Sequence, residues 1–367
     1  MLDWNLYRDS FSTAAMRDIW SESATISTWI RVEQTLARCQ ADIGLIPSEA
    51  AAKIESLSAR DLNDADLLQE MTLVGRPIVG LVNQLRNLVG SDLAPYVHYR
   101  ATTQDILDTA LAIQMQQGLA VVYSALADVT AQIQRHIDSQ QGTKMIGRTN
   151  GQHALPIMLR TKLEVWQAEL DRRKAALEDA GGRGLMVQIG GPLGDLGNYD
   201  GDKGQLVKTC VADALNLGSA EPHWQNARDG VAEIVTACGA LCASLCKITH
   251  NVNLLSSSDI GEFSEGHEDG KGASSSMAHK RNQRASEFGE AVARLGRQRS
   301  EQIGEVTLHQ HERAGGVWIA EWVIVPEVFL LTSGALNWAK QIFATLNVHS
   351  DIMAQKSALA ESTNRSH

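Results

Sequence analysis

Apolar residues spaced three and four positions apart dominate the middle of the chain. One such run begins after Asp108, and a second follows Arg228. Each run gives a helix a broad apolar face that has to be buried against other helices, so the pattern predicts a bundle of long helices. The two faces consist of Leu111, Met115, Leu119, Val122, Leu126, Val129 and Ile133, and of Val231, Val235, Cys238, Cys242, Leu245, Val252 and Leu255.

The rest of the chain fits an all-α fold. Residues 156–178 and 284–311 are also helical in composition, and the stretch before about residue 105 indicates shorter helices with frequent breaks. Polar and apolar residues hardly alternate anywhere, which argues against a large sheet. We therefore predict an N-terminal helical domain at 1–107 and a central bundle at 108–345. Polar, glycine-rich stretches predict the loops where sites usually lie, at 140–153, 180–204 and 256–282.

Composition and charge narrow the functional classes. The 367 residues include only 7 prolines and 5% aromatics, which suits long helices. A net charge of −10 argues against nucleic acid as a partner, and an anionic substrate would need local positive charge at its site. We identify no apolar run long enough to cross a membrane and no secretory signal, so we expect a cytoplasmic protein.

Five cysteines are present, and none form a CxxC pair. Cys238, Cys242 and Cys246 repeat every four residues on one helix face, either as a metal or redox cluster or as small residues under a helix contact. We favour the packing role, because cysteine is among the residues most often buried, and a reducing cytoplasm fits. We predict neither a bound metal nor a cofactor.

The first segment that could carry chemistry is 271–282. Its glycine and serines allow backbone N–H groups to turn toward an anion, while Lys280 supplies a charge and Asn282 a neutral donor. The alternative is a solvated linker, which serine-rich stretches often form.

A second segment, 96–105, places Thr102 and Thr103 before a long helix. They could cap that helix, bind a carboxylate at its positive end, or do both. His98 is a candidate acid or base.

Two further polar segments precede or separate helices. In 147–156, Thr149, Asn150 and His153 come before Pro156, a natural first-turn residue of a helix. Segment 188–197 follows no predicted strand and lacks a nucleotide-binding motif, so it indicates a tight turn that leaves Gln188 free to contact a ligand.

Taken together, these segments resemble the fumarase/aspartase/argininosuccinase superfamily, whose hallmark is G-S-S-x-M-P-x-K-x-N. Residues 273–282 match it except at Ala273 and Ala278, and the other segments follow in the expected order. The stretch from Glu312-Arg313 to Pro326-Glu327 looks like the branch that contains adenylosuccinate lyase and 3-carboxy-cis,cis-muconate cycloisomerase.

This resemblance implies a homotetramer with a core of long helices, in which each active site draws on three chains. The broad apolar faces, which one chain need not bury alone, fit such an assembly. Members of this branch commonly run longer, so residues 346–367 look like a remnant of a truncated C-terminal domain.

The resemblance also implies roles in a reaction on a small anionic polycarboxylate. Removing a proton beside a carboxylate yields a doubly charged enediolate, which needs preorganised positive charge and donors. Ser274 takes the position of the general base, Lys280 and Asn282 would stabilise the enediolate, and His98 and Glu287 are further catalytic candidates. The remaining predicted substrate-binding residues are Thr102, Thr103, Thr149, Asn150, Gln188, Ser275, Met277, His153 and Arg100.

Two departures from the family pattern affect the chemistry. Asn150 stands where eliminating members usually have a histidine that protonates the leaving group, and Arg100 stands where glycine is usual. Either His98 or His153 supplies the proton, or the reaction needs no strong acid there.

Three hypotheses follow. The first is a cycloisomerase that adds a substrate carboxylate across a conjugated double bond to close a lactone, supported by the branch and by Asn150. The second is a lyase that eliminates fumarate from a succinyl compound. The third is a structural relative that has lost activity.

Overall fold

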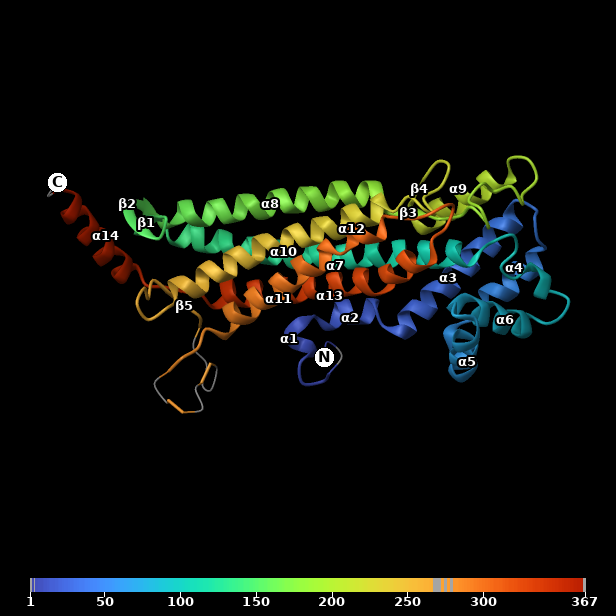
Figure 1. Cartoon of the computed structure of the whole chain (residues 1–367), viewed down its shortest axis with the longest axis horizontal. Coiled ribbons are helices and arrows are strands. Elements are labelled where there is room, and N and C mark those ends of the chain that lie inside the picture. The colour runs from blue at the N-terminus through green and yellow to red at the C-terminus, as the bar shows by residue number, and fades with distance from the viewer. Residues whose placement is uncertain (1, 3, 267–271, 274–275, 278–279, 366–367) are drawn as a thin grey trace.

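The long helices predicted from the apolar runs form one elongated bundle in the computed structural model (Figure 1). The structure describes residues 2, 4–266, 272–273, 276–277 and 280–365. Five helices lie along the long axis of the molecule, namely α7 (Thr103–Ser139), α8 (Leu159–Gly184), α10 (Asp229–Leu255), α11 (Arg284–Glu301) and α13 (Gly315–Thr345).

The two predicted apolar faces are confirmed as core. Every residue named for them is buried except Leu111, which is partly buried against the same core. One chain therefore buries these faces by itself, so their burial does not bear on the number of subunits. Cys238 and Cys242 are buried in this packing, as expected for small core residues.

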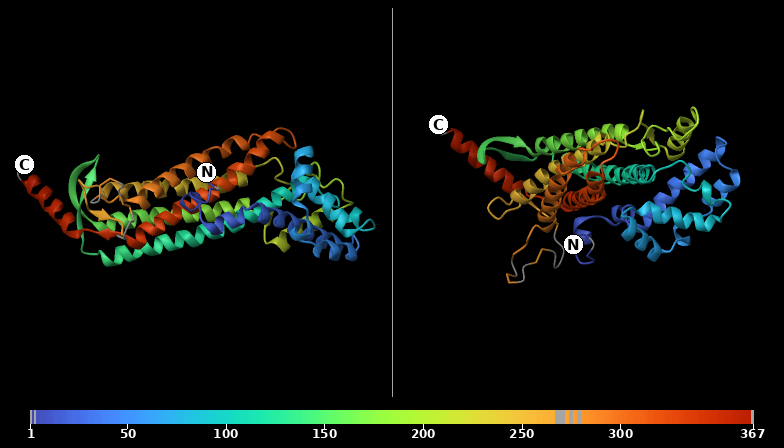
Figure 2. Two further views of the ribbon diagram at one scale, coloured as in Figure 1. Left: turned by 90° about the horizontal axis from the view of Figure 1, so that it is seen from below. Right: turned by 45° about the vertical axis from the view of Figure 1, so that its right-hand side comes forward.

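Shorter helices gather at one end of the bundle and form a second apolar core (Figures 1 and 2). This core also takes in the first turns of α7, through Ile106 and Ile113, and α9 from later in the chain. The elements at this end are α3 (Glu22–Asp42), α4 (Ser48–Glu55), η1 (Ala59–Asp61), α5 (Asp64–Val74), α6 (Pro77–Val89), η2 (Ala94–Tyr96) and α9 (Lys203–Leu215); α1 (Arg8–Phe11) and α2 (Ala14–Ile19) precede them.

The expected absence of a large sheet is confirmed for the described residues. They contain three two-stranded sheets: β1 (Lys144–Thr149) with β2 (Gln152–Met158), β3 (Met186–Val187) with β4 (Gly218–Ser219), and β5 (Phe263–Ser264) with β6 (Asn347–Val348). β3 comes directly before Gln188, so the expectation that no strand precedes that segment is wrong.

The C-terminal segment is structured where it is described. β6 pairs with β5, and α14 (Ser350–Arg365) packs against the β1–β2 hairpin at the end of the bundle opposite the N-terminal helices (Figure 1). The predicted helix at 284–311 is interrupted at Gln302, and only the short α12 (Ile303–Val306) follows.

Three helices, α7, α10 and α13, are long and apolar enough by composition to cross a membrane, which the sequence reading did not identify. In each, at least half of the most apolar stretch is buried inside the protein. Their apolar residues form the core described above, as in a soluble helical bundle.

A disulfide joins Cys39 of α3 to Cys210 of α9. This bond links two helices that lie far apart in the sequence, and a reducing cytoplasm would not favour it. The sequence offered no spacing signal for the pair, because 171 residues separate the two positions.

A close helix contact gives a test of this packing. Gly184 ends α8, and a Cβ atom there would lie 2.4 Å from the carbonyl oxygen of Gly230 at the start of α10. We expect Gly184→Ala to lower the free energy of unfolding by about 1–3 kcal/mol, because backbone cannot move aside as a side chain can. Gly304→Ala is the matched control. No atom lies within 4 Å of a Cβ atom built on Gly304, so this substitution should not lower the free energy of unfolding. Equal urea midpoints for Gly184→Ala and the wild type, at one protein concentration, would contradict the contact.

Candidate active site

Five predicted site residues gather where α7 begins, namely His98, Arg100, Thr102, Thr103 and Gln188. Thr102 occupies the N-cap position of α7, so the predicted cap is confirmed. Thr102 and Thr103 remain partly exposed, with the positive end of the helix beside them.

Asp105 ties the start of α7 to the glycine-rich loop. Its buried carboxylate accepts hydrogen bonds from the backbone N–H groups of Thr102 (3.0 Å), Gly190 (2.9 Å) and Gly191 (3.0 Å). Gly191 has a φ of +74°, which glycine adopts without strain. Burial raises the pKa of Asp105 to about 6, although the three N–H donors act in the opposite direction.

Gln188 is fully buried and has a free donor. Its side-chain oxygen accepts the Trp224 backbone N–H at 3.1 Å, whereas its Nε2 has no hydrogen-bond partner in the described part of the chain. A Cβ atom on Gly190 would lie 3.0 Å from this nitrogen, so the amide faces the glycine turn. A buried donor without a partner is costly, which supports a ligand-binding role.

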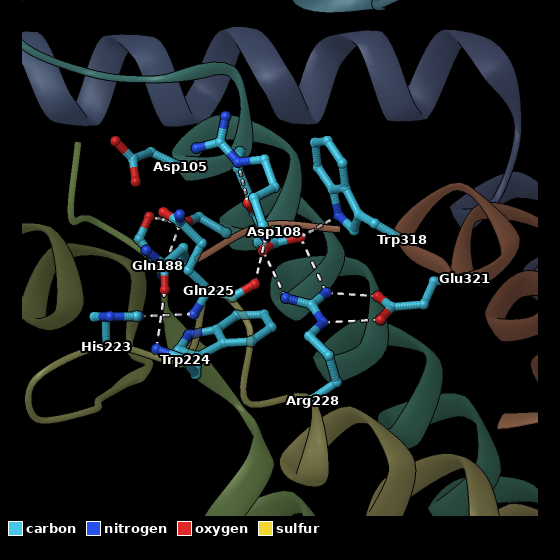
Figure 3. A network of polar contacts seen from close by, with 12 residues as sticks. Asp105, Asp108, Gln188, His223, Trp224, Gln225, Arg228, Trp318 and Glu321 are labelled. Carbon is cyan, nitrogen blue, oxygen red and sulfur yellow. Dashed lines mark hydrogen bonds and ion pairs between the residues drawn. The ribbon is translucent and has the colours of Figure 1, made fainter. Parts of the chain in front are cut away.

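Behind this end lies a buried ionic network (Figure 3). Both ends of the Arg228 guanidinium are occupied: Asp108 accepts at 2.7 and 3.1 Å, and Glu321 accepts at 2.8 and 2.5 Å. The Trp318 indole N–H also donates to Asp108 at 3.0 Å, and the Trp224 ring lies 4.5 Å from the guanidinium carbon. The network fixes α7, α10 and α13 to one another at the site.

Arg313 is a site candidate that the sequence reasoning missed. Its Nε donates to Gln104 Oε1 at 2.8 Å, and its Nη2 lies 3.4 Å from Thr102 Oγ1 and 3.2 Å from the Pro192 carbonyl oxygen. No carboxylate within the described residues forms an ion pair with it. Arg313 thus provides positive charge beside the threonines; its place in the branch-specific stretch was the available signal.

His98 is held by a carboxylate from another helix. Its Nδ1 lies 2.6 Å from Oε1 of Glu33, which is only 2% exposed. Burial acts to lower the pKa of His98, but the charge and hydrogen bond of Glu33 outweigh burial, and the pKa is raised. Arg100 is engaged elsewhere, donating to Asp200 at 3.3 Å and lying over the Tyr99 and Tyr199 rings.

Thr149, Asn150 and His153 lie exposed on the β1–β2 hairpin at the other end of the bundle. Asn150 and Gly151 form the turn with φ values of 52° and 78°, a left-handed pair for which Asn-Gly is strongly preferred. This turn corrects the prediction for Pro156, which lies in β2 rather than in a first helical turn. Arg148, next to Thr149, forms a two-pronged ion pair with Glu262 at 2.6 and 2.9 Å.

The described residues of the hallmark motif, just before α11, lie toward the same end (Figure 1). Lys280 and Met277 are exposed, and the Asn282 backbone and side-chain nitrogens both donate to the Gly272 carbonyl oxygen, at 2.9 and 3.1 Å. Glu287 pairs with Arg284 at 2.6 Å. Ser274 and Ser275 lie outside the described residues.

One chain thus holds two half-sites and does not bring them together. The 37 residues of α7 separate the Thr102 end from the hairpin, a distance of about 55 Å at about 1.5 Å per residue. We call His98, Thr102, Gln188 and Arg313 the first candidate half-site. Thr149, Asn150, Lys280 and Asn282, at the other end of the bundle, are called the second candidate half-site, although no described contact joins the hairpin to Lys280 or Asn282. The described residues contain no cluster of three or more metal-ligating side chains.

Comparison with known proteins shows the family. The family model described as lyase matches residues 8–295. The chain is 32% identical to trans-aconitate decarboxylase 1 of Mycosarcoma maydis (94% of this chain, 70% of the relative) and 34% identical to 3-carboxy-cis,cis-muconate cycloisomerase of Acinetobacter baylyi (95% and 79%). It is 32% identical to N-acetyl-S-(2-succino)cysteine lyase of Enterococcus italicus (97% and 78%).

The fold agrees with this relationship. The solved structure of β-carboxy-cis,cis-muconate cycloisomerase from Acinetobacter calcoaceticus sp. ADP1 superimposes with a TM-score of 0.88 at 30% identity, covering 96% of this chain and 80% of that one. The chain therefore belongs to the lyase family of the fumarase/aspartase superfamily and is an enzyme of that superfamily.

Proposed function

We propose that this enzyme is a 3-carboxy-cis,cis-muconate cycloisomerase-like catalyst of aromatic catabolism that closes a lactone. The observation that carries the proposal is Asn150 at the tip of the hairpin, where eliminating members have an acid. The ring oxygen comes from a carboxylate, which is already an anion and needs no proton, either to attack or to leave in the reverse direction. Relatives named for this activity support the assignment.

The proposed reaction places charge at the second half-site. A carboxylate oxygen of the substrate bonds to one carbon of a conjugated double bond, and the electron pair moves onto another carboxylate as an enediolate (the aci-carboxylate). A proton then adds to the carbon beside that group. We assign Lys280 and Asn282 to the enediolate and Ser274 to the proton transfer, the serine on the basis of the family motif alone.

The first half-site would bind the remaining carboxylates. Arg313 supplies charge, Thr102 and Thr103 supply hydroxyls at a helix start, and Gln188 supplies its free amide donor. Arg100 and Glu287 have partners within the chain, so their predicted roles remain predictions. The predicted substrate-binding roles of Thr149, His153, Ser275 and Met277 also remain predictions.

A shared site in a homotetramer is part of the proposal, because the two half-sites of one chain lie at opposite ends of α7. An open groove of about 720 Å³ supports such an assembly, since alanines on α8 and α10 would let a helix of another copy approach closely. The alanines are Ala176, Ala180, Ala232, Ala237 and Ala240. A cytoplasmic location is also proposed, and there the Cys39–Cys210 pair would be reduced.

The second candidate is a fumarate-releasing lyase of the adenylosuccinate or argininosuccinate lyase type. The His98–Glu33 pair favours it, because a protonated histidine can give a proton to a leaving group. A relative named for a succino compound also supports it. The third hypothesis, an inactive structural relative, is not retained, because the chain belongs to an enzyme family.

The test of function is a panel of 3-carboxymuconate, adenylosuccinate, argininosuccinate and substituted succinates, followed by ultraviolet absorbance and product mass. We expect lactone from the first compound and no fumarate from the others. Asn150→His should not raise the rate with 3-carboxymuconate, because no acid is needed there. Fumarate release, or a large gain in Asn150→His, would support the elimination; no turnover of any compound would contradict both candidate functions.

Lys280 tests the second half-site. We expect Lys280→Ala to lower kcat/KM by about 10²–10³-fold, because it removes positive charge from the developing enediolate. Helical content by circular dichroism should not change, since the side chain is exposed. Lys340→Ala, which removes an exposed lysine paired with Asp128, is the control. Activity near that of the control would exclude the role of Lys280.

The raised pKa of Asp105 predicts that kcat/KM falls at acid pH. As pH falls through about 6, Asp105 gains a proton and loses an acceptor for the Gly190–Gly191 turn, so kcat/KM should fall. The raised pKa means that this group stabilises the fold more at low pH, and its contribution is lost as pH rises through about 6. The loss of activity should therefore occur without unfolding by circular dichroism.

Asp105→Asn provides the matched variant, because the amide imitates the protonated acid. Its kcat/KM should be low and independent of pH between about 5 and 7. An acid limb that persists in Asp105→Asn would show that another group causes it.

A further inference from the structure

We propose that Glu33 is a positioning residue for the reaction: it holds His98 as an imidazolium whose Nε2–H is presented to the substrate in the first half-site. This inference rests on the proposed function, because it assigns a partner to one of the residues of that site. Glu33 lies in α3, 65 positions before His98, outside the segments that the sequence indicates could carry chemistry.

The first argument is burial. Glu33 is 2% exposed, and His98 is its only hydrogen-bond or ion-pair partner in the described part of the chain. A carboxylate taken out of water needs a paired charge or strong donors. The donor at 2.6 Å is the His98 ring, so the charge of Glu33 is balanced only when His98 carries a proton on both nitrogens.

The second argument is the orientation of the ring. Glu33 accepts from Nδ1, which leaves Nε2 as the outward nitrogen, and Nε2 makes no hydrogen bond within the described residues. The His98 side chain keeps 14% of its surface exposed, so a ligand can reach the ring. The ring therefore has one fixed nitrogen and one free donor, four residues before Thr102.

The third argument is the backbone. His98 has a φ of 59° and Arg100 a φ of 58°, left-handed conformations that are uncommon outside glycine. Gln40, seven residues after Glu33 on α3, donates to the Tyr99 carbonyl oxygen at 2.7 Å and so supports the backbone between His98 and Arg100. Strain of this kind persists where the surroundings hold it, often at functional sites.

The charges that face His98 come from three helices. Glu33 of α3 and Asp105 of α7 favour the imidazolium, and Arg86 of α6 opposes it. Glu33 alone is in direct contact with the ring, so it is the side chain whose removal should change the protonation of His98. In the cycloisomerase reaction Nε2–H would donate to a substrate carboxylate; in the elimination it would break and its proton would pass to the leaving atom.

The experiment compares Glu33→Gln with Gln40→Met. Glutamine keeps the shape of Glu33 and removes its charge, whereas Gln40→Met weakens the support of the same loop from the same helix without touching the ring. The His98 titration is followed by NMR of ring-labelled histidine in the whole protein without substrate, with the signal assigned through His98→Asn. The pH dependence of kcat is then measured for each variant.

We expect Glu33→Gln to lower the pKa of His98 and to move the basic limb of kcat to lower pH. We also expect a fall in kcat of about tenfold or more at neutral pH, with a smaller change in KM. Glu33→Asp should recover part of the loss, and Gln40→Met should leave the His98 titration where it is in the wild type.

Two results would overturn the inference. If the His98 titration is the same in Glu33→Gln and the wild type, Glu33 does not hold the imidazolium, whatever the reaction. If the titration moves but kcat and its basic limb do not, Glu33 does not position His98 for catalysis. The first measurement needs no substrate, so failure of the proposed function leaves it intact as a test of the contact.

Discussion

The site depends on the buried contact of Arg228 with Asp108 and Glu321. Arg228 comes directly before α10, Asp108 lies in α7 and Glu321 lies in α13, and all three are almost fully excluded from water. Such a group is stable only as a complete set, because removing one member leaves a buried charge without a partner. The same Asp108 accepts from Gln104, which in turn accepts from Arg313, so the ionic network and the orientation of Arg313 are parts of one arrangement.

The length of α7 sets the second constraint. A straight helix of this length gives the bundle its core, but it also keeps the threonines at its start away from the hairpin that follows its end. A compact site within one chain is therefore ruled out by helix geometry. The chain carries a net charge of −10, so in the proposed tetramer an anionic substrate would need local positive charge where the half-sites of different copies meet.

Much of the fold could be predicted from the sequence because burial of long helices follows a simple period. The runs through Val122 and Val235 gave both the existence and the type of the helices. The hairpin differs from the prediction for this segment. Pro156 lies in a strand rather than in a helix, and Asn150 and Gly151 form a turn with two left-handed residues. The break at Gln302 and the Cys39–Cys210 bond depend on tertiary contacts that no local pattern records.

The candidate site, like the fold, could be predicted from local sequence patterns but not in its tertiary contacts. Motif residues such as Lys280 could be named from the sequence, yet the partners that give them chemical properties could not. Glu33 carried only a weak signal, an acidic side chain beside Val32 within an apolar stripe, and its contact with His98 spans 65 positions. Arg313 lay in a stretch that indicated the branch of the family, but its approach to Thr102 required the fold.

The packing of the last helix has a consequence for how this protein can change over evolution. α14 rests on the hairpin with Asn150, and β6, just before it, pairs with β5, the strand that leads toward Lys280. The hairpin and the strand that precedes Lys280, more than a hundred positions apart, therefore both pack against the C-terminal segment. A substitution in β6 or α14 would displace the hairpin and β5 together. New substrate preferences at this end would therefore tend to arise through coordinated movements of both segments rather than through independent changes in either.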